Sequence, residues 1–283
     1  MRSVKGKRVL VTGGAMGMGR LFAERAIAEQ AAAVVLWDVN EAALNDTLNE
    51  LADSATEISG YIVDVADAEE VAGTAAAVLD DLKGIDVLIN NAGVVRGNKY
   101  FWETDLEHDT KATIDINTLG PMYVAHEFLP AMIAEPGECR MLNLASAAGF
   151  TPNPRMAVYA ASKWAVIGWS DSVRLELKQA GLDHVKVTTV CPYYVRTGMF
   201  DGARSAPLLP ILDPADVVEE AWGAMLAGRP FVVMPKTVML SEMLKGVVPT
   251  GVRDFIADHV IGVYHTMDDF LSLIHISEPT RPY

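Results

Sequence analysis

Cysteine, positive charge and long apolar runs are all scarce in this sequence. Cys139 and Cys191 are too few for a disulfide framework, which favours a reducing compartment. The 23 Lys and Arg residues stand against 37 Asp and Glu, a formal net charge of −14, whereas binding to nucleic acid or anionic lipid needs a basic face. Apolar stretches such as Ala31–Trp37 are far shorter than the roughly 20 residues that span a bilayer. We therefore expect a cytoplasmic protein with no membrane anchor and no nucleic-acid partner.

Metal-ligand patterns are missing too. The sequence contains no HExxH motif and no cluster of cysteine and histidine, so we expect no structural or catalytic metal. Cys191 has no adjacent base that would activate its thiol, and we expect it to be a small buried hydrophobic residue.

Short apolar runs alternate with helical patterns along most of the chain. Six runs are expected strands, with a seventh near 231–234; the six cover residues 8–11, 33–37, 60–63, 85–89, 141–144 and 185–190. This alternation predicts an α/β fold, a doubly wound parallel sheet of the Rossmann type with helices on both faces. No repeat or linker interrupts it, so residues 1–270 are expected to form one domain. Its looser segment, about 193–250, is expected to cover a substrate cleft.

The last thirteen residues, 271–283, do not fit this pattern. Their sequence resembles the translation of a transposase adapter used to prepare sequencing libraries. We expect a non-native tail that packs poorly, joined to a metagenomic gene whose natural C-terminus is missing. The alternative is an ordinary polar tail.

A glycine cluster follows the first strand and opens a helix. Gly13, Gly17 and Gly19 let the backbone turn and approach a ligand closely, and Met18 lies between them. Backbone N–H groups at a helix N-terminus suit a pyrophosphate, so the pattern predicts a dinucleotide site. Flexible turns also use glycine, which keeps the pattern by itself ambiguous.

Asp38 and Asp64 end the second and third predicted strands. A carboxylate at position 38 accepts hydrogen bonds from a ribose 2′-hydroxyl and repels a 2′-phosphate, so NAD(H) is favoured over NADP(H). Asp64, or the amide of Val65, is expected to bind the adenine edge. The alternatives are a turn aspartate at position 38 and an aspartate that leads into a helix at position 64.

Tyr159 and Lys163 stand one helical turn apart, on one face of a predicted helix. A free tyrosine has a pKa of about 10, and a nearby cation favours the phenolate and lowers that pKa. Ser146 lies at the end of an earlier strand, where open α/β sheets bind their ligands. The segment 90–93, which contains Asn91, Ala92 and Gly93, follows another strand in the same way.

Together these motifs resemble the short-chain dehydrogenase/reductases, in their single-domain branch. The glycine cluster, the segment 90–93, Ser146 and the Tyr159–Lys163 pair occur in that family's order and spacing across 5–270. The resemblance implies a catalytic tetrad of Asn117, Ser146, Tyr159 and Lys163. It also implies an oxidoreductase that uses NAD, and it adds the following cofactor contacts: Asn91, Ala92, Gly93, Tyr159, Lys163, Pro192, Val195 and Thr197.

The same resemblance implies a role for each member of the tetrad. Ser146 and Tyr159 hold a carbonyl oxygen, and Tyr159 exchanges a proton with it as general acid or base. Lys163 lowers the tyrosine pKa and holds the nicotinamide ribose, and Asn117 orders a water that replaces the proton. Oligomers of this family imply a homotetramer or homodimer, in which Trp164 and Trp169 pack between subunits.

Residues 191–200 resemble the branch that contains retinol and 17β-hydroxysteroid dehydrogenases, although Tyr193 stands where most of the family has glycine. This implies a bulky, lipophilic secondary alcohol or ketone as the small-molecule substrate. Its expected contacts are Phe150, Met156, Tyr193, Tyr194, Met199 and Phe200. Two alternatives remain: a 3-oxoacyl-thioester or polyol dehydrogenase of the same fold, and a regulatory protein that senses NAD without turnover.

Overall fold

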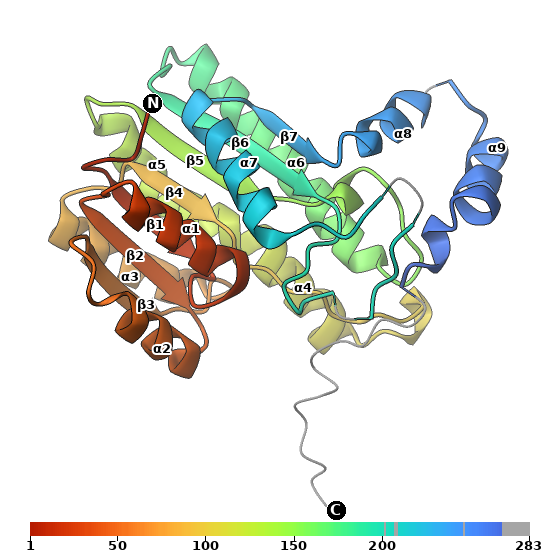
Figure 1. Cartoon of the computed structure of the whole chain (residues 1–283), viewed down its shortest axis with the longest axis horizontal. Coiled ribbons are helices and arrows are strands. Elements are labelled where there is room, and N and C mark those ends of the chain that lie inside the picture. The colour runs from red at the N-terminus through yellow and green to blue at the C-terminus, as the bar shows by residue number, and fades with distance from the viewer. Residues whose placement is uncertain (201, 207–208, 246, 268–283) are drawn as a thin grey trace, which may run out of the picture.

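Seven parallel strands form the centre of the computed structural model, which describes residues 1–200, 202–206, 209–245 and 247–267. The strands are β1 (Arg8–Thr12), β2 (Ala33–Asp38), β3 (Glu57–Ile62), β4 (Val87–Asn90), β5 (Cys139–Leu144), β6 (Val185–Pro192) and β7 (Phe231–Met234). Their order in the sheet is β3-β2-β1-β4-β5-β6-β7 (Figure 1). The order reverses between β1 and β4, and a doubly wound sheet opens its ligand crevice at such a point. The predicted α/β fold is confirmed.

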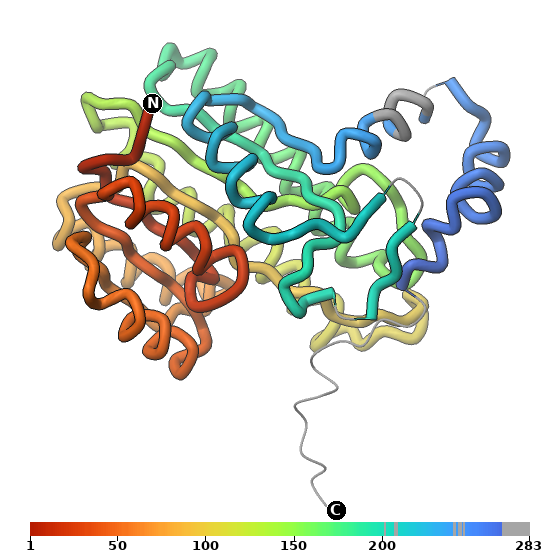
Figure 2. Tube along the Cα trace, viewed as in Figure 1, coloured from red at the N-terminus to blue at the C-terminus, as the bar shows by residue number. Residues whose placement is uncertain are grey.

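Helices cover both faces of the sheet (Figure 2). The longer ones are α1 (Gly17–Ala28), α2 (Glu41–Leu51), α3 (Ala68–Leu82), α5 (Gly120–Ala134), α6 (Ala157–Gln179), α7 (Pro214–Ala227) and α8 (Thr237–Lys245). Shorter pieces are α4 (Ala112–Ile114), α9 (Thr250–Phe255), the π-helical turns η2 (Leu106–Lys111), η3 (Asp115–Leu119) and η5 (Ile256–Val260), and the 3-10 turns η1 (Phe101–Glu103), η4 (Ala147–Gly149) and η6 (Val263–His265).

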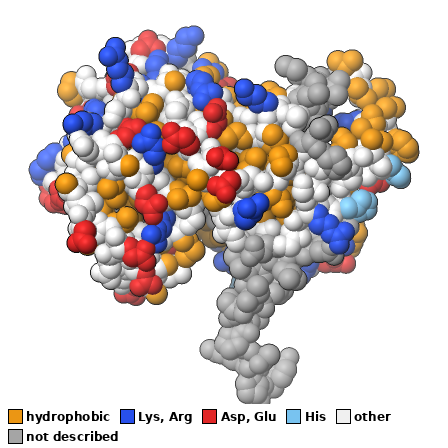
Figure 3. All heavy atoms as spheres, viewed as in Figure 1, with side chains coloured by type: hydrophobic (Ala, Val, Ile, Leu, Met, Phe, Trp, Pro, Cys, Tyr) orange, Lys and Arg blue, Asp and Glu red, His pale blue; other side chains and the backbone are white. Residues whose placement is uncertain are grey.

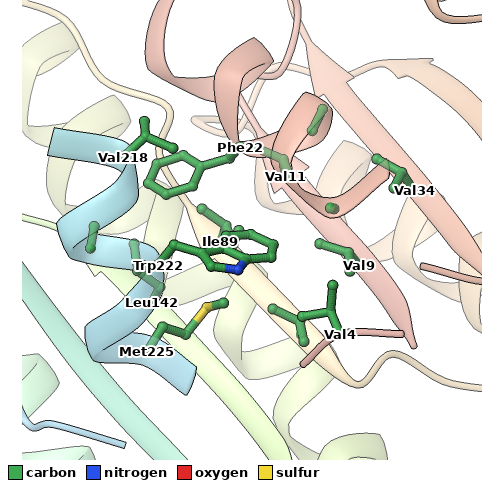
Figure 4. Packing of buried hydrophobic residues seen from close by; sticks show 14 of the residues in the cluster. Val4, Val9, Val11, Phe22, Val34, Ile89, Leu142, Val218, Trp222 and Met225 are labelled. Carbon is green, nitrogen blue, oxygen red and sulfur yellow. The ribbon is translucent and has the colours of Figure 1, made fainter. Parts of the chain in front are cut away.

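One hydrophobic cluster joins the sheet to α1 and α7. Trp222 of α7 is fully buried and stacks on Phe22 of α1, with 6.4 Å between the ring centroids (Figure 4). The indole N–H of Trp222 donates to Glu29 Oε1 at 3.1 Å, just past the end of α1. These contacts hold α1 against the sheet and so place its N-terminus, where the glycine cluster lies.

The opposite face of the sheet has its own cluster, with α3, α5 and α6. Leu10, Val35 and Leu88 point to this face, while their chain neighbours Val9, Val34 and Ile89 point to the α1–α7 face. Side chains alternate in this way along any strand. Because both faces are covered, the central strands are mostly apolar, which made them visible in the sequence.

The predicted strand ends differ from the structure by up to three residues, and the largest difference is at the start of β3. β3 begins at Glu57 rather than at residue 60, because this edge strand is only half-buried and its first residues are polar. The π-helical turns η2 and η3, with the short helix α4 between them, lead into α5. α3 begins with a side-chain cap, since the Asp67 carboxylate accepts from the amides of Glu69 and Glu70.

The segment expected to cover the cleft, residues 193–250, has two structural parts. α7 and β7 belong to the sheet and its helical layer. α8, α9 and the turn η5 form an arm on the side of the molecule away from the N-terminus (Figure 2). Apolar side chains are exposed on this arm (Figure 3): Val252, Phe255, Ile256 and Val260. The expected non-native tail, 271–283, lies outside the described residues.

Within those residues, no helix is long and apolar enough to cross a bilayer. The same part of the chain contains no group of three or more His, Cys, Asp or Glu side chains that could hold a metal ion.

Substituting Gly19 by alanine tests the close approach at the start of α1. A Cβ at this position would overlap Gly13 O, so Gly19→Ala should lower the free energy of unfolding by about 2 kcal/mol or more. Gly73 of α3 is the matched control, because a Cβ there meets nothing within 4 Å. Gly73→Ala should be neutral or stabilising by up to about 1 kcal/mol. Urea unfolding measures both, and equal stability of the two variants would contradict the described loop.

Candidate active site

The glycine loop at the N-terminus of α1 is open to a ligand. Gly13 and Gly17 have φ of +62° and +56°, a region that glycine occupies without strain. Met16, the N-cap of α1, gives no side-chain cap, so the first amides of the helix are not bonded by that residue. Amides in this position bind phosphate, and the loop therefore fits the pyrophosphate of a dinucleotide.

Residues at the end of β4 brace that loop. Thr12 Oγ1 accepts from the amides of Asn91 and Ala92, both at 3.1 Å. Asn91 Nδ2 donates to Thr12 O and Gly13 O, both at 3.0 Å. Asn91 thus holds the glycine loop in position, and it also lines the cleft between β1 and β4. Thr12 was missed as a functional residue, since a threonine at the end of a strand gives no distinctive signal.

Asp38 lies beside the glycine loop. Its Oδ2 accepts from Ala15 N and its Oδ1 from Asn40 N, both at 3.0 Å. A carboxylate has about four acceptor sites, so these two bonds leave capacity for ribose hydroxyls. The position therefore fits the predicted role in cofactor choice.

Asp64 and Val65 lie in the turn between β3 and α3. Asp64 Oδ1 accepts from Ala66 N at 2.9 Å, in the turn before α3. Its side chain also lines a shallow surface cavity with Arg96 and Lys111. Val65 is buried, and a Cβ on Gly120 would lie 2.9 Å from Val65 Cγ2. The geometry of Asp64 matches the alternative of an aspartate that leads into a helix, and its adenine contact stays a prediction.

Ser146, Tyr159 and Lys163 come together at the carboxyl end of β5. All three are buried, and Ser146 Oγ donates to Pro192 O at 3.4 Å and accepts from Ala148 N at 3.1 Å. Lys163 Nζ lies 5.8 Å from the centre of the Tyr159 ring and donates to Leu144 O at 3.0 Å. The helix α6 carries Tyr159 and Lys163, and the strand end carries Ser146, so the fold itself brings the predicted groups together.

Burial controls the protonation of this group. Burial raises the pKa of Tyr159 to about 12, although the neighbouring Ser146 hydroxyl acts in the opposite direction. Burial lowers the pKa of Lys163 to about 8. Desolvation is the largest cause, so the pKa of Tyr159 lies above its free value, and the expected lowering by Lys163 stays a prediction. At neutral pH Tyr159 carries its proton, as a general acid must.

The side-chain amide of Asn117 makes hydrogen bonds to neighbouring residues of the protein. Asn117 lies in η3, where Oδ1 accepts from Val94 N at 2.8 Å and Nδ2 donates to Val94 O at 2.9 Å and Ser162 Oγ at 3.2 Å. A Cβ on Gly93 would lie 3.2 Å from Asn117 Oδ1 and 3.5 Å from Lys163 Nζ. Asn117 thus ties the segment after β4 to α6. Its role in ordering a water stays a prediction.

Two cavities meet at these hydroxyls. The larger one, which we call the main cavity, has a volume of about 230 Å³, and the smaller one about 50 Å³. Ser146, Tyr159 and Tyr193 line both. The smaller cavity is also lined by predicted cofactor contacts, namely Met18, Asn91, Gly93, Lys163, Pro192, Val195 and Thr197. It therefore lies where a nicotinamide is expected, with the main cavity on the other side of the hydroxyls.

Five of the six predicted substrate contacts line these cavities. Met156, Tyr193 and Tyr194 line the main cavity, and Met199 and Phe200 line the smaller one. Phe150 lines neither among the residues described, because its ring packs on Phe231 with 5.6 Å between the centroids. Sequence reasoning missed the contributions of the arm and of the loop before α6: Asn153, Val238, Lys245, Arg253, Ala257, Ile261, Val263 and Tyr264.

Tyr193, which replaces a glycine of the family pattern, takes up an ordinary backbone conformation. It is not among the non-glycine residues with positive φ in the described chain. Its amide donates to Met234 O at 2.7 Å, and its ring lies 4.4 Å from that of Tyr194. The substitution therefore adds an aromatic wall to both cavities without backbone strain.

The two tryptophans expected between subunits have different surroundings. Trp164 is half exposed on α6, and its Nε1 donates to Ala148 O at 3.0 Å. Trp169 packs against the cluster on the α3–α5 face of the sheet. The homotetramer or homodimer stays a prediction.

Comparison with known proteins gives relatives over nearly the whole chain. Epidermal retinol dehydrogenase 2 of Mus musculus is 35% identical over 274 residues, covering 95% of this chain and 86% of the relative. Estradiol 17-beta-dehydrogenase 11 of Rattus norvegicus is 30% identical over 253 residues, covering 89% and 83%.

Solved structures agree with these relatives. A short chain dehydrogenase/reductase from Burkholderia phymatum in complex with NAD has a TM-score of 0.79 and 27% identity, over 87% of this chain and 95% of that one. A metagenomic short-chain oxidoreductase in complex with NADP has a TM-score of 0.68 and 27% identity, over 81% and 95%. The sequence pattern of the short chain dehydrogenases matches residues 7–207. The chain belongs to the short-chain dehydrogenase/reductase family and is an oxidoreductase of the dehydrogenase class.

Proposed function

We propose that the protein interconverts a lipophilic secondary alcohol and its ketone with NAD(H). The observation that carries this proposal is the pair of Ser146 and Tyr159, whose side chains are buried and line both cavities where these meet. A carbonyl oxygen placed at that boundary can contact both hydroxyls while its carbon faces the smaller cavity.

The residues of the cleft suit a nicotinamide dinucleotide. The glycine loop would receive the pyrophosphate. A Cβ on Gly13 would lie 3.0 Å from the backbone of Ala92, so the loop has no room for a side chain at this position. Lys163 and Thr197 line the smaller cavity, where they would hold the ribose and the carboxamide of the cofactor. The cofactor, when bound, supplies or accepts the hydride.

The protein supplies position and the proton. In reduction Ser146 and Tyr159 orient the carbonyl oxygen, and Tyr159 gives it the phenolic proton. In oxidation Tyr159 must lose that proton, and the positive charge of Lys163 stabilises the phenolate. The buried position of both residues excludes water, which strengthens these interactions.

The lining of the main cavity supports a lipophilic substrate. Met156, Val238, Ile261 and Val263 present apolar surface to it. Such walls leave the hydroxyls of a polyol without partners, which disfavours that alternative. Relatives named retinol dehydrogenase and estradiol 17-beta-dehydrogenase share this chain's family, and we extend their chemistry to a bulky secondary alcohol here.

Tyr159→Phe tests the chemical step. Removing the proton donor should lower kcat for ketone reduction by about 10³-fold, within the range for general acids. Binding of NADH, measured by fluorescence titration, should change little. The control is Tyr100→Phe, which removes a hydroxyl from a half-exposed ring outside both cavities and should keep full activity.

Two results would contradict the assignment. Undiminished reduction by Tyr159→Phe would remove this residue from the chemistry. Binding of NADH without turnover of any ketone, in wild type and variant alike, would favour the regulatory alternative.

Asp38→Asn tests cofactor choice. Asparagine keeps an oxygen for the Ala15 amide but removes the charge that repels a 2′-phosphate. The ratio of kcat/KM for NADH to that for NADPH should fall by about 10-fold or more, corresponding to about 1.4 kcal/mol. Asp38→Ala should relax the preference as well and also destabilise the loop. An unchanged ratio in both variants would show that Asp38 does not set the preference.

A further inference from the structure

The main cavity has two ends of different chemistry. At its inner end, Ser146 and Tyr159 join it to the smaller cavity. At its outer end, Pro152, Lys245 and Arg253 also line a shallow surface cavity that neither Ser146 nor Tyr159 reaches. Apolar side chains, among them Met156, Val238 and Ile261, also line the main cavity. A ligand that fills the cavity would therefore have one end at the reacting hydroxyls and the other beside two cationic side chains.

Lys245 holds its ammonium group in a sheltered place. Nζ lies 4.9 Å from the centre of the Trp164 ring and 2.5 Å from Glu242 Oε1. Only 19% of its side chain is exposed. The Nζ atom is buried, and no described residue gives it a hydrogen bond of acceptable geometry. An ammonium has three N–H donors, so its ion pair with Glu242 leaves capacity for an added acceptor.

Arg253 is fixed from behind by an acid outside the cavity. Its Nε and Nη2 donate to Asp254 Oδ1 at 3.0 and 2.8 Å. The Tyr264 hydroxyl donates to the same oxygen at 3.0 Å. Arg253 and Tyr264 both line the main cavity, whereas Asp254 does not. Asp254 therefore positions two cavity-lining groups and leaves guanidinium donors for a ligand, since arginine has five.

The charged side chains that line the main cavity in the described part of the chain are all positive. Lys245 and Arg253 line the main cavity, and no Asp or Glu lines it in the described part of the chain. Apolar walls strengthen the attraction between such cations and an anion, because they lower the local dielectric constant. A guanidinium and an ammonium at the same end of a cavity can both donate charge-assisted hydrogen bonds to one carboxylate.

We propose that Lys245 and Arg253 select substrates that carry a carboxylate on the end of the apolar body remote from the reacting alcohol or ketone. This inference rests on the proposed function and narrows its substrate class to lipophilic oxo- or hydroxy-carboxylic acids. Glu242, which contacts Lys245 from outside the cavity, competes with that carboxylate and weakens its binding.

Kinetics with a matched pair of substrates tests the selection. The probes are a medium-chain carboxylic acid with a remote ketone and its neutral methyl ester. In Lys245→Met and Arg253→Met, kcat/KM for the acid should fall about 10- to 100-fold through KM, the expected loss of a bond to a charged group. The ester should be reduced at unchanged rates, which also shows that the variants are folded.

Three further variants sharpen the test. Lys236→Met removes a lysine that is exposed and does not line the main cavity, and it should leave both substrates unaffected. Arg253→Lys should restore part of the selection for the acid. Glu242→Gln should raise kcat/KM for the acid several-fold, since the competing carboxylate is gone. Equal losses for acid and ester, or a loss for the acid in Glu242→Gln, would overturn the proposal.

A binding measurement separates this proposal from the proposed function. Isothermal titration can use a saturated fatty acid of the same chain length, which has no ketone, and the methyl ester of that acid. This measurement needs no turnover. Wild type should bind the acid at least 10-fold more tightly than the ester, and Lys245→Met should abolish the difference. Equal affinities in wild type would overturn the selection even if ketone reduction is active. Preferential binding of the acid without any ketone reduction would sink the proposed function alone.

Discussion

The structure depends most on how α6 is held against the carboxyl end of β5. The Lys163 ammonium donates to Leu144 O, and Tyr159 lines the same two cavities as Ser146, which lies just beyond the strand. These contacts join a helix to a strand end in a buried place where unpaired polar groups are costly. They also fix the boundary between the two cavities. Position, protonation and exclusion of water at the site all follow from this one junction.

The rest of the fold supports that junction from two directions. Stacking of Trp222 on Phe22 holds α1 on one face of the sheet, and bonds from Thr12 and Asn91 hold the glycine loop beside β4. On the other face, Asn117 ties the segment after β4 to Ser162 of α6. The glycine loop and the hydroxyl pair thus reach one crevice from separate strands, as expected at a reversal of strand order.

The central strands and the residues of the junction could be predicted from the sequence because each has a local signal. Buried parallel strands are mostly apolar, and Tyr159 and Lys163 share a helix face. The arm has no such signal. Lys245 and Arg253 look like ordinary surface residues until α8 and α9 bring them over the main cavity. The packing of Phe150 on Phe231 and the effect of burial on the pKa of Tyr159 could not be predicted, because packing and desolvation depend on tertiary neighbours.

The central claim is that one oxygen of the substrate meets both buried hydroxyls. A crystal structure of the protein with NAD(H) and an unreactive ketone analogue tests this most directly. The account predicts the ketone oxygen about 2.6–3.2 Å from both Ser146 Oγ and Tyr159 Oη, with the apolar body in the main cavity. A ketone bound in that cavity with its oxygen away from both hydroxyls would contradict it.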